Sequence, residues 1–389
     1  MSQLVLPVIP STSPTLAETM RACRLRAGLL RATGSAGYVL GNPKAWLGTA
    51  YHEVLEKFAC LESIVDVEAA AVQFWDRAVD AQHQRAAAHQ LNRRFGSPET
   101  WPGYHLVRAS ALLRAREVSA GGTALGATGS GDAGTIRERQ FVAVGGKLVG
   151  RPDLIRHREV VDYKSGAIFE YDESSQSDVV KAAYVRQLRI YGFLVKEVLG
   201  WWPTRGVLLP FAGAGVEVPL EPKECMREAV EAVAVLDDYN SNITARALPE
   251  QLADPSATTC KWCSFKLVCT PLWSAVSPDW SGKLDGAVVD GVLDEPPRAI
   301  HGGAATSLTV NVQNGSEERK RVQLAPLNPN IHPEVTAVSR GDRVRLVGLR
   351  RRPDGSLVPT PLTVLARVDG LPAIVPASET EKGGTFSIS

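Results

Sequence analysis

Apolar residues recur at helical spacing in several parts of this chain, separated by short polar or glycine-rich segments. A repeat of three to four residues indicates a helix with one buried face. The pattern is clearest over residues 178–199, where Gly200 follows as a residue suited to ending a helix. Near the N-terminus, Ser13 stands before Pro14 and is suited to cap a first helix. We therefore predict helices over residues 11–30, 46–60, 67–88, 178–199 and 223–239.

A second pattern, typical of strands, lies between the third and fourth of these helices. Residues with high strand propensity fill two neighbouring stretches, and Gly145 and Gly146 between them are suited to a hairpin turn. Helices and strands in this order predict an α/β domain over residues 1–276. Its strands are expected at residues 136–144, 147–155, 160–164 and 207–219.

The last quarter of the chain has a different pattern. Short apolar stretches alternate with polar turns, which is typical of a small β-barrel or β-sandwich. A segment rich in Pro, Gly and Asp precedes them and predicts a linker at residues 277–300. We expect a separate all-β domain of OB-like form over residues 301–389. Its strands are expected at residues 307–312, 321–325, 342–350 and 362–367.

The composition indicates a globular protein but does not indicate which partners it binds. The 389 residues are 44% hydrophobic and 22% charged, as in ordinary globular proteins. The net charge of +1 neither favours nor excludes nucleic acid, so any such binding has to rest on local basic patches. No apolar run reaches the roughly 18 residues of a membrane span. No basic region precedes the apolar N-terminus, as it would in a secretory signal. These features predict a cytoplasmic protein.

Residues 119–135 are rich in glycine, as phosphate-binding loops are. They lack the Gly-Lys-Ser/Thr ending that such a loop needs to hold a nucleotide. We expect a flexible surface loop there. The chain has no Walker motif elsewhere, so it cannot unwind a duplex by itself.

Two aspartates and a lysine in neighbouring predicted strands form the main candidate site. Asp153 stands in the sequence GRPDLI, and Asp162 and Lys164 stand in VVDYKSG. Residues two apart in a strand point to the same face, which places Lys164 beside Asp162. Mg²⁺ prefers oxygen ligands such as these carboxylates, and a bound Mg²⁺ activates water for phosphodiester cleavage. A neighbouring ammonium neutralises developing negative charge. Taken alone, the same residues also fit ordinary charged strand ends in a hairpin.

In the order of its motifs the chain resembles the PD-(D/E)xK nucleases. Among them it is similar to the RecB-like branch, whose members carry an iron–sulfur cluster and include nuclease domains of recombination helicase–nucleases and CRISPR-adaptation nucleases. The resemblance covers residues 14–271 and implies a restriction-endonuclease-like core, with a mixed central sheet flanked by helices. The positions that match the motifs are His52, Glu138, Asp153, Asp162, Lys164, Gln187 and Tyr191.

The resemblance also implies roles for these residues. Mg²⁺ or Mn²⁺ would be held by His52, Asp153 and Asp162, and Glu138 would be a strand glutamate that precedes the first aspartate. Gln187 and Tyr191 are four residues apart, so they share one helical face and can both reach the site. Considered singly, His52 and Tyr191 also fit packed helix positions, and Glu138 fits a solvated strand residue.

Three of the six cysteines lie within the segment 260–269, one short of a closed four-ligand site. A distant fourth ligand is therefore expected. The resemblance supplies Cys23 and implies a [4Fe–4S] cluster, whereas four thiolates by themselves also fit zinc. Cys60 and Cys225 are expected to be packed thiols. The expected ligand set is Cys23, Cys260, Cys263 and Cys269.

Six arginines lie between residues 339 and 352. On a barrel strand they fit a groove that contacts the phosphates of a single strand. Residues 281–368 contain no Trp, Tyr or Phe, so platforms for base stacking are missing there. A solvated arginine face fits the same pattern.

These observations predict a metal-dependent DNA nuclease that acts on single strands or DNA ends in repair, recombination or defence. Because the chain lacks a helicase motif, a helicase or another recruiting protein is an expected partner. The rival class is a catalytically silent, nucleic-acid-binding scaffold subunit of a helicase or defence complex. A scaffold has no need of an intact Asp–Asp–Lys set, which argues against that rival.

Overall fold

The computed structural model describes residues 3–59, 66–119, 135–156, 158–210 and 213–377. At its centre is a five-stranded sheet in the order β10-β9-β6-β5-β2. β6 and β9 run parallel, and the other neighbours run antiparallel. The five strands are β2 (Ile136–Arg137), β5 (Leu154–Arg156), β6 (Glu159–Lys164), β9 (Arg205–Pro210) and β10 (Val216–Pro219).

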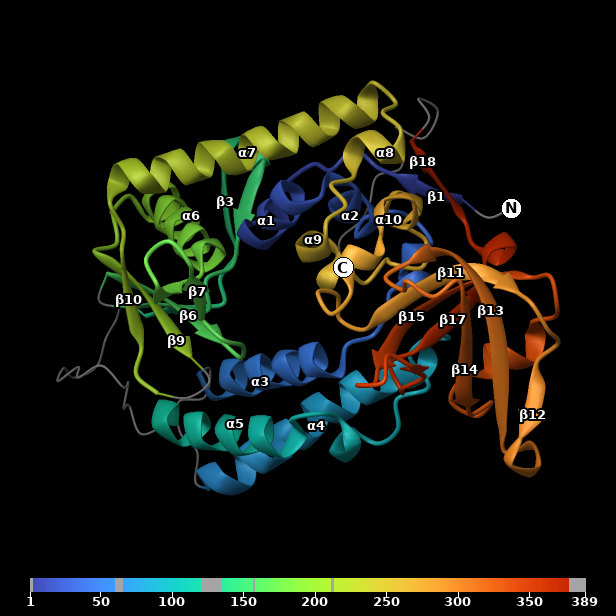
Figure 1. Cartoon of the computed structure of the whole chain (residues 1–389). Coiled ribbons are helices and arrows are strands. Elements are labelled where there is room, and N and C mark those ends of the chain that lie inside the picture. The colour runs from blue at the N-terminus through green and yellow to red at the C-terminus, as the bar shows by residue number, and fades with distance from the viewer. Residues whose placement is uncertain (1–2, 60–65, 120–134, 157, 211–212, 378–389) are drawn as a thin grey trace.

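Helices cover both faces of this sheet (Figure 1). Along β6, Val160 packs into a core with α6 and α7, whereas Tyr163 packs into a core with the helices of the opposite layer. The predicted α/β core, a mixed sheet flanked by helices, is confirmed. The covering helices are α6 (Ala182–Leu199) and α7 (Pro222–Thr244) on one face, and α3 (Pro43–Ala59), α4 (Val67–Ala88) and α5 (Tyr104–Ser119) on the other.

The helix predicted at residues 11–30 is two helices, α1 (Pro14–Ala22) and α2 (Arg24–Leu29). Ser13 caps α1 as predicted, with its Oγ accepting a hydrogen bond from the Leu16 N–H at 3.2 Å. The prediction of one continuous helix is wrong because Cys23 is extended, with φ −165° and ψ 107°. Cys23 ends α1 and caps α2, and its thiol accepts a hydrogen bond from the Arg26 N–H at 3.4 Å.

The start of the helix predicted at residues 178–199 is also wrong, since α6 begins at Ala182. The preceding residues form β8 (Ser177–Val180), which pairs with β7 (Phe169–Asp172) in a separate hairpin. Consecutive β-branched residues at 179 and 180 favour that strand over a helical turn. Gly200 ends α6 as predicted.

The long hairpin predicted at residues 136–155 is interrupted. At the end of the hairpin far from the turn, β2 pairs with β5. Beside the predicted turn at Gly145 and Gly146, β3 (Phe141–Ala143) pairs with β4 (Leu148–Gly150). Glu138 lies in the interruption with a positive φ of 46°, so its prediction as a strand residue is wrong. This conformation is rare outside glycine, and it lifts Glu138 out of the strand ladder.

Two elements have no clear signal in the sequence pattern. The buried positions of α5 include small residues such as Ala111 and Ala115, which give a weak apolar stripe. β1 (Gln3–Leu6) becomes a strand only by pairing with β18 (Ala373–Pro376) at the other end of the chain.

The predicted glycine-rich loop and Cys60 fall on residues 120–134 and 60, outside the described part of the chain.

The C-terminal part is a curved antiparallel sheet, seen at the right of Figure 1. Its central strand is β11, which pairs with both β13 and β15. The sheet comprises β11 (Ala287–Leu293), β12 (Arg298–Ile300), β13 (Ala305–Gly315), β14 (Arg321–Leu327), β15 (Arg343–Arg351), β16 (Leu357–Val358) and β17 (Val364–Arg367).

The prediction of a linker at residues 277–300 is wrong where the chain forms β11, a strand at the centre of this sheet. Asp290 and Gly291, which gave that segment the composition of a linker, have specific places in the sheet. Asp290 is fully buried and accepts hydrogen bonds from Arg343 at 2.8 Å and Arg345 at 3.2 Å. A Cβ at Gly291 would lie 2.2 Å from the Asn311 carbonyl oxygen, so the strand crossing requires glycine.

Replacing Asp290 by Ala is expected to destabilise the protein by about 3 kcal/mol, because it leaves the buried guanidinium of Arg345 unpaired. Urea unfolding measures the effect. The matched control is Asp294→Ala, which removes a carboxylate whose partner Arg321 is exposed and should change stability little. Equal unfolding midpoints for the two variants would contradict the structural role of Asp290.

The C-terminal sheet and the cysteine segment share one apolar core. Trp273 and Leu267 pack there with Val288 and Val347 of the sheet. Arg345 donates a hydrogen bond to the Leu267 carbonyl oxygen at 2.7 Å and lies over the Trp273 ring. The sheet is thereby fixed against the end of the α/β core. Within the described residues, no helix is long and apolar enough to cross a membrane.

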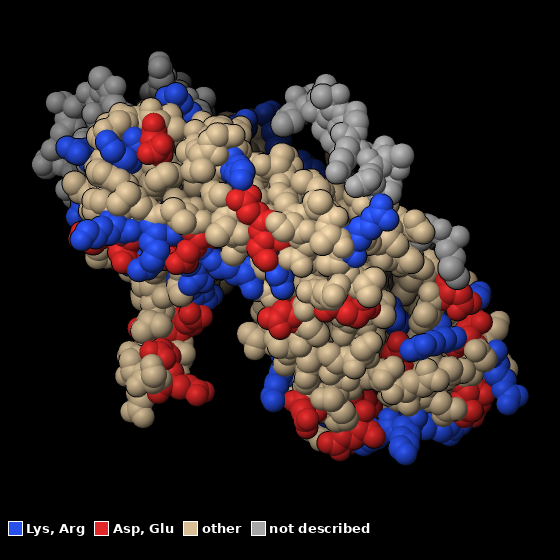
Figure 2. All heavy atoms as spheres, turned by 90° about the horizontal axis from the view of Figure 1, so that it is seen from above, with Lys and Arg blue, Asp and Glu red and all other residues tan. Residues whose placement is uncertain are grey.

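Basic and acidic side chains are interspersed on the face seen from above in Figure 2. No broad region of that face has one sign of charge, in keeping with the net charge of +1. Binding of a phosphate backbone on this face would have to use small groups of residues.

Candidate active site

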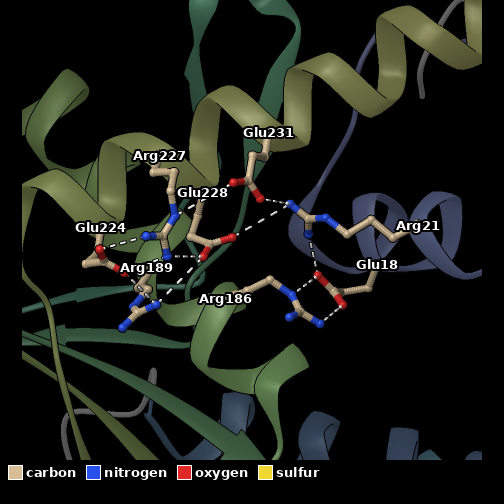
Figure 3. A network of polar contacts seen from close by, with 8 residues as sticks. All are labelled: Glu18, Arg21, Arg186, Arg189, Glu224, Arg227, Glu228 and Glu231. Carbon is tan, nitrogen blue, oxygen red and sulfur yellow. Dashed lines mark hydrogen bonds and ion pairs between the residues drawn. The ribbon is translucent and has the colours of Figure 1, made fainter.

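Ion pairs fix the helix that faces the end of β6. On α6, Arg186 donates hydrogen bonds to Glu18 of α1 at 2.8 and 2.7 Å, and Arg189 lies 3.0 Å from Glu224 of α7. The position of α6 is therefore set from two neighbouring helices, α1 and α7. Figure 3 shows the whole network, which comprises Glu18, Arg21, Arg186, Arg189, Glu224, Arg227, Glu228 and Glu231.

Four of the predicted site residues meet between β6 and α6. The Lys164 ammonium lies 2.5 Å from Asp162 Oδ2 and donates a hydrogen bond to Gln187 Oε1 at 2.8 Å. Gln187 Nε2 in turn lies 3.1 Å from both Asp162 Oδ1 and the Tyr191 hydroxyl. The period of two along β6 and the spacing of four along α6 thus bring these side chains together.

Asp153 joins this group from the turn that precedes β5. Its Oδ2 accepts a hydrogen bond from the Tyr163 N–H at 2.6 Å, so the neighbouring strand fixes its carboxylate. The Glu138 N–H donates a hydrogen bond to the Asp153 carbonyl oxygen at 3.3 Å, and the charge of Glu138 raises the pKa of Asp153. The interruption of the hairpin therefore turns Glu138 toward the first aspartate.

The three carboxyl groups have raised pKa values. Burial raises the pKa of Asp162, and the Lys164 ammonium opposes that shift. Burial and the negative charge of Asp162 raise the pKa of Asp153 well above its usual range. Burial raises the pKa of Glu138 to about 7, although Arg151 opposes the shift. Mutually repelling, desolvated carboxylates are groups whose charge a divalent cation would neutralise.

The donor set fits a divalent cation in its chemistry, but the side chains do not form a closed ligand group. Asp162 Oδ2 is buried against the Lys164 ammonium, which lies 2.5 Å away and occupies the place next to this oxygen. Among the residues that the structure describes, no three His, Cys, Asp or Glu side chains stand close enough to hold a metal ion. Metal binding by the predicted set of His52, Asp153 and Asp162 would require these side chains to move.

His52 lies on α3, on the other side of the site. Burial, together with the nearby charge of Lys164, lowers its pKa to about 4, so the imidazole is neutral at neutral pH. A neutral imidazole is the form that binds metal ions. Gly48, one turn earlier, allows α3 to come close, because a Cβ there would lie 2.7 Å from the Ser165 hydroxyl.

Three further residues contact this group without having been predicted. Arg151 lies 2.8 Å from Glu56 Oε1 and 2.7 Å from Glu138 Oε2. The Lys164 ammonium lies 4.5 Å from the centre of the Tyr184 ring. Helical spacing could have indicated two of them. Glu56 lies four residues after His52, and Tyr184 lies three residues before Gln187, so each shares a helical face with a predicted site residue.

A second candidate site lies about the predicted cysteines. The extended conformation of Cys23 places it on the same cavity as the three cysteines of the segment 260–269, and this cavity has a volume of about 20 Å³. None of the cysteines in the described ranges forms a disulfide. Cys225 is buried elsewhere, beside Gly192, as expected for a packed thiol. The four cysteines on the cavity are Cys23, Cys260, Cys263 and Cys269.

Burial raises the pKa of Cys260 to about 11, and it also raises the pKa values of Cys263 and Cys269. Two cations stand near these thiols and oppose the shift for Cys263, namely Arg26 and the buried Lys266. Buried thiols of this kind ionise when a metal binds them, because coordination stabilises the thiolate.

A model of the PD-(D/E)XK nuclease superfamily matches residues 11–270 of the chain. The match covers more than half of the chain, and it includes the central sheet, its covering helices and all four cysteines of the cavity. The chain belongs to the PD-(D/E)XK nuclease superfamily. Its members are generally nucleases, which hydrolyse phosphodiester bonds, and they typically use divalent metal ions such as Mg²⁺. No curated protein matches the chain significantly.

Proposed function

We propose that the protein is a metal-dependent deoxyribonuclease of the RecB-like branch, acting on single strands or DNA ends in repair, recombination or defence. The observation that supports this most directly is the network of Asp162, Lys164, Gln187 and Tyr191, with Asp153 beside it. Such a network keeps a carboxylate and an ammonium buried at one point of a nuclease fold. A silent scaffold would gain nothing from that arrangement.

Asp153 and Asp162, with His52, are the residues that would hold Mg²⁺ or Mn²⁺, which when bound polarises a phosphate and lowers the pKa of an attacking water. Gln187 fixes the rotamer of Asp162 through its amide and is itself held by the Tyr191 hydroxyl. With a cation at Asp162, the Lys164 ammonium would be free to neutralise negative charge that develops on the phosphate. The Tyr184 ring beneath Lys164 keeps the ammonium close to the site.

We assign a [4Fe–4S] cluster to Cys23, Cys260, Cys263 and Cys269. A tetrahedral zinc site requires four sulfurs at about 2.3 Å from one point. The four cysteines line one cavity, and four thiolates by themselves suit either zinc or a cluster. The order of the motifs, which resembles that of the RecB-like branch, favours a cluster over zinc. The cluster would join α2 to the end of the nuclease core.

DNA is the proposed partner, with a helicase or another recruiting protein beside it in the cytoplasm. The predicted basic strand contributes less than its sequence indicates, because half of its arginines have internal partners. Arg343 and Arg345 pair with Asp290, and Arg351 pairs with Glu317. The arginines left exposed for phosphate contacts in this stretch are Arg340, Arg350 and Arg352.

Incubation of the pure protein with end-labelled single-stranded and double-stranded DNA, with and without Mn²⁺, tests the proposed activity. We expect cleavage of single strands or ends only when Mn²⁺ is present, since buried carboxylates alone do not activate water at neutral pH. A protein that binds Mn²⁺ and single-stranded DNA but cleaves neither substrate would be a scaffold, which would overturn the proposal.

A further inference from the structure

Arg151 is a half-exposed charged residue beside the candidate active site. It lies two residues before Asp153, and 53% of its side chain is exposed. Its Nη2 lies 2.8 Å from Glu56 Oε1, and its Nε lies 2.7 Å from Glu138 Oε2 and 2.6 Å from the Glu138 carbonyl oxygen. The guanidinium therefore joins α3 to the interrupted hairpin.

One of these two glutamates also lies next to a proposed metal ligand. The Glu138 N–H donates a hydrogen bond to the Asp153 carbonyl oxygen at 3.3 Å, so the residue that pairs with Arg151 also lies beside the first aspartate. When ionised, the four carboxyl groups of Glu56, Glu138, Asp153 and Asp162 exceed the charges of Arg151 and Lys164 by two. A divalent cation would balance that excess and compete with Arg151 for Glu138.

We propose that Arg151 binds a phosphate of the substrate strand, and that Glu56 and Glu138 hold it back until a divalent cation occupies the active site. This inference rests on the metal-dependent function proposed above. An arginine cannot lose its charge, so an Arg151 that leaves Glu138 keeps only Glu56 as a partner and has N–H groups free for another anion. A phosphate matches the planar guanidinium and accepts two parallel hydrogen bonds from it. Cation binding and substrate binding are thereby coupled through one side chain.

If cation and substrate binding are coupled in this way, Arg151→Ala in the full-length protein should change the affinities for Mn²⁺ and for an oligonucleotide in opposite directions. In the absence of nucleic acid, Arg151→Ala should bind Mn²⁺ about three-fold more tightly, because a competing positive charge is gone. With Ca²⁺ present, the same variant should bind a single-stranded oligonucleotide about ten-fold more weakly. Without divalent cations the loss should be smaller, since Arg151 is then held by the glutamates. Free Mn²⁺ is measured by its EPR signal and oligonucleotide binding by fluorescence anisotropy.

Arg158→Ala is the matched control, because it removes the same charge from the turn at the opposite end of β6. It should leave both affinities unchanged. Glu56→Gln is the converse variant. It should strengthen oligonucleotide binding without divalent cations, and Arg151→Ala in the same chain should remove that gain.

The outcomes separate the inference from the function on which it rests. If the wild-type chain binds no Mn²⁺, both are wrong. If Asp162→Asn abolishes Mn²⁺ binding but Arg151→Ala changes neither Mn²⁺ nor oligonucleotide affinity, the metal site stands and the role of Arg151 is refuted. Weaker oligonucleotide binding to the same extent with and without Ca²⁺ would also refute it, because Arg151 would then be a plain phosphate contact.

Discussion

Replacing Asp162 by Asn should reduce metal-dependent DNA cleavage by about a thousand-fold, which is the scale expected when a buried charge is removed from the reacting centre. The amide keeps the shape of the carboxylate, so the contact with Gln187 and the packing of β6 remain. Lys164→Met should reduce cleavage to a similar degree while preserving Mn²⁺ binding, because it removes the ammonium and not a ligand. Cleavage rates, Mn²⁺ affinity and circular dichroism distinguish these effects.

Lys181→Met is the matched control for Lys164→Met. Lys181 also lies over the Tyr184 ring, at 5.6 Å, but it donates its hydrogen bond to the Ala167 carbonyl oxygen, outside the carboxylate network. Its loss should leave cleavage nearly unchanged. Full activity in Asp162→Asn or Lys164→Met would show that the catalytic centre lies elsewhere.

Replacing Cys23 by Ala should remove the cluster and destabilise the nuclease core. An anaerobically purified wild-type chain should be brown and contain about four irons, as expected for a cluster held by four cysteines. Cys23→Ala should lose both the colour and the iron as fully as Cys260→Ala, although Cys23 is far away in sequence. It should also unfold at a clearly lower urea concentration, since the cluster closes a long loop and couples ligation to folding.

Cys225→Ala is the control, because Cys225 is buried beside Gly192 and away from the cavity. This variant should stay brown and keep its iron. A colourless anaerobic protein with one zinc per chain would refute the cluster, whereas the nuclease assignment would be unaffected.

The resemblance selected the residues of the candidate site, and local periodicity predicted which of them share a face. The two-residue period of β6 places Asp162 and Lys164 on one face, and the four-residue spacing of Gln187 and Tyr191 places them on the facing side of α6. The structure has these four side chains in one hydrogen-bonded network. The metal ligands and the cluster remain predictions.

What the sequence could not predict depends on contacts between distant segments. Nothing local marks Asp290 as a buried ion-pair partner, because its arginines lie more than fifty residues later. The ion pair of Arg151 with Glu56 likewise exists only because α3 packs beside the hairpin. Cys23 breaks a segment with good helical pattern, since its thiol faces a cavity formed by residues near 260.

The pairing of β1 with β18 determines when the fold can be completed. Gln3 lies beside Ala373 in a parallel pair, so the first strand of the described chain has its partner 370 residues later. Contacts of such sequence separation form slowly, because a long loop must close before they contribute. During synthesis the nuclease core can assemble, and Leu4 and Leu6 of β1 can pack in it, while β1 still lacks its partner strand β18. The unpaired edge of β1 is then open to other chains, so a ribosome stalled before β18 should leave a product that aggregates despite an assembled nuclease core.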